Sequence, residues 1–152
     1  MTDTRLRWLS ADLADRLKNS SGEKRREAVL AACSLAVEHS ALTDPNATSV
    51  LARLKLGEVI DDHSRQSLDR LVVAWDEEAW NEVDATHCGN LSQHSLKFNK
   101  ARAANALLYA LTQGHGQNEW LGAAEAIYEV LVCLDDDPKG EDLTRAIDEM
   151  LR

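Results

Sequence analysis

Apolar residues recur at helical spacing along most of the chain, and this periodicity is clearest over residues 64–85. At about 100° per residue, one arc of that segment collects the apolar side chains expected to pack inward: Leu68, Leu71, Val72, Trp75, Ala79 and Val83. No segment shows sustained alternation of apolar and polar residues between hairpin signals, so we expect essentially no sheet. The sequence therefore predicts an all-α fold.

About six to seven helices are expected, separated by short segments rich in Gly, Asn, Asp and Pro. Their predicted ranges are 11–19, 23–39, 47–55, 64–85, 93–111, 119–134 and 141–151. A chain of 152 residues is long enough to bury an adequate core, so we expect one domain over residues 1–152. Helix pairs of comparable length suggest a helical repeat, but no sequence self-similarity recurs at a fixed period. An irregular helical bundle is the favoured architecture.

The net charge of −9 is unevenly distributed. Residues 58–90 hold nine carboxylates and two arginines, a net charge of −7, whereas residues 91–117 hold three basic residues and no acidic one. Such a surface repels nucleic acid and suits a basic protein partner. A negative charge that only keeps a small protein soluble explains the composition equally well.

The side of helix 64–85 opposite the apolar arc carries a tryptophan among carboxylates. The residues that we assign to this candidate partner-binding face are Asp69, Val73, Asp76, Glu77, Trp80 and Asp84. A large exposed aromatic ring surrounded by carboxylates is typical of a surface that binds a cationic partner. Alternatively, Trp80 packs under the N-terminal segment against Trp8 and Leu9, and nearby arginines neutralise the acids within the same molecule.

Two features within the helices carry charges that need partners. Lys24, Arg25 and Arg26 lie in the first turn of helix 23–39, where the helix dipole disfavours cations, and a neighbouring acidic segment would neutralise them. Glu82 lies near the inward arc of helix 64–85. A partly buried glutamate needs a partner, and we expect an ion pair with a basic residue of the following helix, Lys97, Lys100 or Arg102.

Candidate chemistry is sparse. His87, Cys88 and His94 are suitable zinc ligands, but their spacing matches no closed zinc pattern, so we predict neither a metal nor another cofactor. The sequence contains no nucleophile elbow, glycine-rich phosphate loop or zinc-protease motif. We therefore expect that the protein is not an enzyme. A helical enzyme that uses Glu82 and the His87/His94 region is the least favoured alternative.

The remaining sequence features bear on location and assembly. No apolar run approaches the ~20 residues of a membrane span, and the first residues lack the pattern of a secretory signal. Three cysteines without a C-x-x-C pair fit a reducing compartment, so we expect a cytoplasmic protein. It is expected to bind neither membranes nor nucleic acid, and to be a monomer or a homodimer.

The expected function is that of a small acidic binding protein that occupies a basic protein partner, such as a toxin enzyme. Bacterial immunity and antitoxin proteins are similar in type, because they too are small, acidic, cytoplasmic and without catalytic motifs. The alternative is a structural or homo-oligomeric helical module, in which Val73 and Trp80 lie in a self-interface. Lys97, Lys100 or Arg102 of the second copy would then have to meet the acidic residues.

Overall fold

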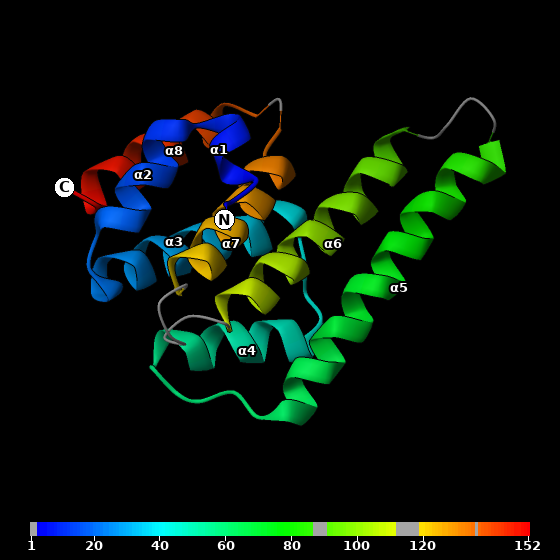
Figure 1. The fold of residues 1–152 in the computed structure, drawn as a ribbon. Helices are drawn as coiled ribbons and strands as arrows, with labels where there is room; N and C mark the ends of the chain where they lie inside the picture. Colours follow the sequence, from blue (N-terminus) through cyan, green and yellow to red (C-terminus); the bar gives the residue numbers. More distant parts are fainter. Residues whose placement is uncertain (1–2, 87–90, 112–118, 136) are drawn as a thin grey trace.

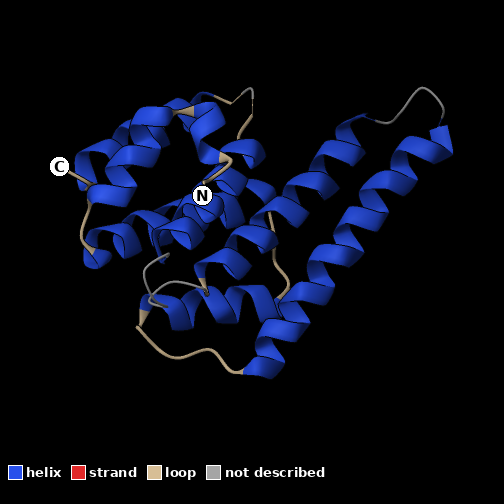
Figure 2. Cartoon of the chain, in the orientation of Figure 1, coloured by secondary structure: helices blue, strands red, loops and turns tan. Residues whose placement is uncertain are grey.

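The computed structural model describes residues 3–86, 91–111, 119–135 and 137–152, and in these ranges every regular element is a helix (Figure 2). Side chains 83–86, 91–94 and 119 lie outside the described part. The eight helices are α1 (Leu6–Leu9), α2 (Ala11–Asn19), α3 (Gly22–Ser40), α4 (Pro45–Lys55), α5 (Asp62–Thr86), α6 (Leu91–Ala110), α7 (Glu119–Cys133) and α8 (Pro138–Met150). The all-α prediction is confirmed, and the four-residue helix α1 is an addition to it.

Local capping explains where most helices begin. The Ser10 hydroxyl accepts a hydrogen bond from the Leu13 amide at the start of α2, and the Ser21 hydroxyl accepts one from the Lys24 amide at the start of α3. Asp61 accepts hydrogen bonds from both the amide and the hydroxyl of Ser64 at the start of α5. Serine and aspartate are among the residues that most often cap helices in this way.

Two helices begin at a proline that lies outside the predicted helical range. The helix predicted over residues 47–55 begins at Pro45, and the helix predicted over residues 141–151 begins at Pro138. In each case an aspartate precedes the proline and accepts hydrogen bonds from the amides that follow, as Asp44 and Asp137 do. The prediction of a turn at these prolines was wrong, because proline fits the first helical position, where no amide donor is needed.

The molecule consists of a helical body and a long antiparallel hairpin formed by α5 and α6 (Figure 1). Helix α7 lies inside the body and packs on α1, α2, α3 and α6. The hydrophobic core is built mainly from small and aliphatic side chains of α3, α6 and α7. The end of the hairpin that contains the C-terminal part of α5 extends away from the body (Figure 1).

The two ends of α5 therefore have different surroundings. Leu68 and Val72 belong to the core of the body. Ala79, two turns after Val72, is also buried but lies outside that core, and α6 is the helix packed along this part of α5. The C-terminal part of α5 is thus held chiefly by its hairpin partner.

No described helix combines the length and the hydropathy that a bilayer span requires.

Candidate functional site

The outer face of α5 is exposed where the sequence analysis placed a partner-binding surface. We use the name outer face for the stripe that Asp69, Val73, Glu77 and Trp80 form at intervals of three and four residues. The side chain of Trp80 is 66% exposed and that of Val73 is 52% exposed. The Asp84 side chain, assigned to the same surface, lies outside the described part. A wide aromatic and an aliphatic side chain therefore meet solvent on a projecting hairpin.

The carboxylates of the outer face have no ion-pair partner in the described part of the chain. Asp69 and Glu77 are exposed and form neither a side-chain hydrogen bond nor a salt bridge with any described residue. Exposed carboxylates of this kind remain fully hydrated and can attract a cation without first breaking an internal contact.

Asp76, which the sequence analysis also assigned to this surface, lies at its inner edge. Both of its carboxylate oxygens accept hydrogen bonds from the Nη2 atom of Arg102 on α6, at 2.9 and 2.8 Å. The same guanidinium donates through Nη1 to Glu129 on α7 at 3.0 Å. Asp76 thus holds α5 against α6 and is linked to α7 only through Arg102, and its charge is largely compensated.

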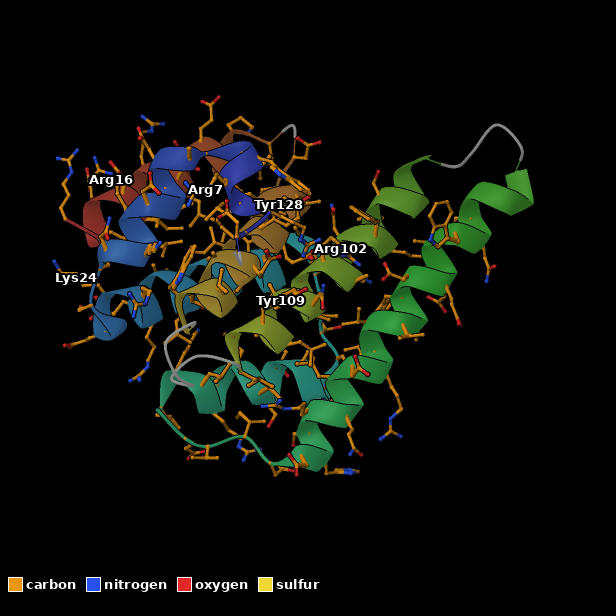
Figure 3. The ribbon with its side chains drawn as sticks, in the orientation of Figure 1. Arg7, Arg16, Lys24, Arg102, Tyr109 and Tyr128 are labelled. Atoms are coloured by element: carbon orange, nitrogen blue, oxygen red, sulfur yellow. The ribbon has the colours of Figure 1, made fainter. Side chains whose placement is uncertain are left out.

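Arg102 belongs to a polar network that the sequence analysis did not predict. The centre of this network is Glu129, whose side chain is 1% exposed. The Glu129 carboxylate accepts hydrogen bonds from Arg5 at 2.8 Å, Arg102 at 3.0 Å and Asn105 at 3.0 Å. Figure 3 shows Arg102 and Tyr109 of α6 with Tyr128 of α7 near the middle of the molecule. A buried carboxylate is tolerated only when it is paired in this way.

Arg5 connects the N-terminal segment to this network. Its Nε atom donates to Glu125 at 2.7 Å, and its guanidinium lies over the Tyr128 ring at 4.4 Å from the centroid. Burial opposes the charge of Arg5, but the hydrogen bonds to Glu125 and Glu129 outweigh it, so the pKa of Arg5 is raised. The Arg102 Nε atom, by contrast, is buried without a hydrogen-bond partner in the described residues.

The basic residues of α6 are engaged in contacts within the molecule. Lys97 Nζ lies 2.7 Å from Glu82 Oε1, which confirms the predicted ion pair, and the hydrogen bond from Lys97 to Glu82 raises the pKa of Lys97. Lys100 Nζ lies 4.6 Å from the centroid of the Trp75 ring. Together with the contacts of Arg102, these interactions occupy the cations that a homodimer through the outer face would require.

The N-terminal arginines do not neutralise the outer face, as one alternative had proposed. Arg7 pairs with Asp3 and Asp15, at 2.8 and 2.9 Å, and Arg5 pairs with the glutamates of α7. Trp8 is itself exposed, so the exposed ring of Trp80 is not buried against it.

The other candidate sites have less support in the described residues. His87 and Cys88 lie outside them, as does the side chain of His94, and no described group of three or more His, Cys, Asp or Glu side chains is arranged to hold a metal. Burial raises the pKa of the Cys33 thiol to about 12 and, as the main cause, that of Cys133 to about 12. Both thiols are therefore protonated near neutral pH.

Comparisons of this chain with models of known protein families, with curated proteins and with solved structures find no significant match.

Proposed function

We propose that the protein binds a basic protein partner through the outer face of α5, with Trp80 as the central contact. The observation that supports this most directly is the exposure of Trp80 one helical turn from Glu77, a carboxylate with no ion-pair partner among the described residues. Aromatic residues at such positions frequently supply a large share of binding energy when a partner removes them from water.

The geometry of the hairpin supports the same proposal. The contacts of Asp76 and Glu82 with α6 fix the rotation of α5, so the outer face is presented on a preorganised helix. Preorganisation lowers the entropic cost of association. The carboxylates of Glu77, one turn from the ring, and of Asp69, farther along the outer face, would steer a cationic surface toward it, giving fast association that weakens with salt.

A binding protein with these properties would act by occupying its partner, as immunity and antitoxin proteins do. Within this proposal the partner is a basic protein, a toxin enzyme being one such candidate, and the protein itself performs no catalysis. Cytoplasmic residence belongs to the same proposal.

The test compares two exposed tryptophans. Wild-type protein, Trp80→Ala and Trp8→Ala are immobilised, and a lysate of the source cells is passed over each. Because Trp8 is also exposed but lies on α1, it controls for general stickiness of an indole ring. We expect a basic protein that binds wild type and Trp8→Ala with equal affinity and binds Trp80→Ala more weakly by about 2 kcal/mol.

Stability decides how a loss of binding is interpreted. Trp80→Ala should leave the free energy of unfolding in urea within about 0.5 kcal/mol of wild type. A partner that distinguishes neither variant from wild type, or a Trp80→Ala protein that unfolds, would refute the proposal.

A further inference from the structure

A second surface feature lies on the body, apart from the outer face of α5. A groove of about 300 Å³ runs between α3, the end of α4, the connection from α4 to α5, and the end of α6. Its apolar lining comes from Val29, Leu30, Leu54, Ile60, Ala110 and Leu111. This volume is at the lower end of the range for small-molecule sites.

Two arginines line the groove from different helices. Arg26 is in the first turns of α3 and Arg65 is in the first turns of α5. Neither has a hydrogen bond or an ion pair through its side chain in the described part of the chain. Asp69, one helical turn after Arg65, does not approach it within ion-pair distance. Both arginines thus lack a carboxylate partner among the described residues of a protein whose net charge is −9.

Arg26 is one of three consecutive basic residues at the start of α3, and the contacts of the other two differ from its own. Lys24 donates to the main-chain carbonyl of Arg152, and Arg25 donates to the carbonyls of Leu17 and Ser20 at the end of α2. Two of the three cations that the sequence places at the start of α3 thus stabilise backbone groups. The third, Arg26, faces the groove.

Glu58 is the acidic residue of the groove lining, and it is already paired. Its carboxylate accepts a hydrogen bond from Arg53 Nε at 3.3 Å. The same guanidinium also pairs with Asp61 at 3.1 Å, so it serves two carboxylates. Among the residues that line the groove, the two arginines still outnumber the one carboxylate.

The connection beside the groove exposes apolar side chains. Val59, which lines the groove, is 90% exposed, and Leu56 is 76% exposed. Gly57 between them has a φ of 75°, which lets the chain turn there and display both side chains. Exposed aliphatic groups next to an apolar groove gain free energy when a ligand covers them.

From this combination we propose that the groove binds a small amphipathic anion, an apolar body that carries a carboxylate. The aliphatic lining would receive the apolar body, and Arg26 and Arg65 would donate charge-assisted hydrogen bonds to the carboxylate. Charge complementarity selects an anion, although the protein as a whole repels one. This site is independent of the proposed partner-binding face.

The experiment is calorimetric titration with three probes at the same ionic strength: decanoate, decyltrimethylammonium and acetate. Decanoate and decyltrimethylammonium share an apolar chain and differ in the sign of their charge, while acetate lacks the chain. We expect decanoate to bind at one site and the other two probes to bind at least tenfold more weakly. Decyltrimethylammonium binding as tightly as decanoate would overturn the proposal, as would no decanoate binding below millimolar concentrations.

Variants then locate the site. Arg26→Gln with Arg65→Gln should weaken decanoate binding roughly tenfold or more, because two charge-assisted hydrogen bonds are lost. Arg70→Gln, an exposed arginine of α5 outside the groove lining, should leave it unchanged. Val59→Asp adds a carboxylate at a side chain that contributes little to the fold and should also weaken binding. Unchanged affinity in the double arginine variant would place decanoate elsewhere and refute the proposal.

The test is separable from that of the proposed function. Trp80→Ala is expected to bind decanoate as wild type does, so failure at either surface leaves the other intact.

Discussion

The carboxylates of α7 and those of the outer face of α5 are the same chemical groups in opposite situations. Glu125 and Glu129 accept hydrogen bonds from Thr4, Arg5, Arg102 and Asn105, and Glu129 has almost no contact with solvent. Asp69 and Glu77 are exposed and have no such partner in the described residues. The first pair is committed to holding helices together, and the second remains available to another molecule.

This difference shows that the net charge of a segment does not determine whether its carboxylates form ion pairs within the fold. Residues 58–90 and 118–152 each carry a net charge of −7. In both segments, arginines of the fold form ion pairs with only some of the carboxylates. Arg102 binds Asp76 of α5 and Glu129 of α7 at once, so a single cation pairs with one carboxylate from each segment.

The largest expected effect is the loss of the buried carboxylate. Glu129→Ala removes the buried acceptor of three partly buried donors, those of Arg5, Arg102 and Asn105, although Arg5 keeps Glu125 and Arg102 keeps Asp76. Breaking a buried ion pair from one side costs about 3–5 kcal/mol. We expect a loss of that order in urea unfolding, whereas Glu77→Ala, on the outer face, should change stability by no more than about 0.5 kcal/mol.

A second substitution separates charge from volume. Glu129→Gln keeps the size of the side chain but removes its charge, so most of the loss should persist if pairing is the cause. A stability for Glu129→Gln near that of wild type would show that packing, not the ion pairs, makes Glu129 important, and would weaken the contrast between α7 and α5.

Most of the fold could be predicted because its signals are local. Apolar spacing indicated the seven longer helices, and Ser10, Ser21 and Asp61, residues of types that favour helix N-termini, directly precede three of them. The helix α1 was missed because four residues give no measurable period. The starts at Pro45 and Pro138 were missed because an Asp-Pro pair fits both a turn and a helix N-terminus.

The candidate site was predictable only in part. Helical periodicity placed Val73 and Trp80 opposite the apolar arc, and the ion pair of Glu82 with Lys97 joins consecutive helices. The contact of Arg5 with Glu129 joins residues 124 positions apart, and no pattern in one sequence specifies which of many carboxylates an arginine reaches. For the same reason, nothing in the sequence distinguished Asp76, which Arg102 binds, from Glu77, which has no ion-pair partner among the described residues.

An intermediate effect is expected for the Glu82–Lys97 ion pair, which is partly exposed near the projecting end of the hairpin. Because α6 is the chief support of this part of α5, removing the pair should promote local opening and leave the body intact. We expect Glu82→Gln or Lys97→Met to speed amide hydrogen exchange in that part of α5 by roughly two- to fivefold.

Combining the two substitutions provides the control. The double variant should exchange no faster than either single variant if the pair acts as a unit. Acceleration that extends into α3 or α7 would contradict the view that the end of the hairpin is stabilised separately from the body.

The smallest effect concerns the electrostatic field around Trp80 and requires no change in stability. In a Trp8→Phe background, Trp80 is the most exposed tryptophan, and its fluorescence is quenched by iodide and by neutral acrylamide. Glu77 lies one helical turn before Trp80, whereas Asp69 lies eleven residues away, about 16 Å along the helix axis. Glu77→Gln should therefore raise iodide quenching by up to about twofold at low ionic strength, and Asp69→Asn should raise it less. Acrylamide quenching should stay constant in both. Equal iodide quenching in all three proteins would mean that the carboxylates create no local field at Trp80, and the outer face would lose its proposed preference for a cationic partner while Glu129 kept its structural role.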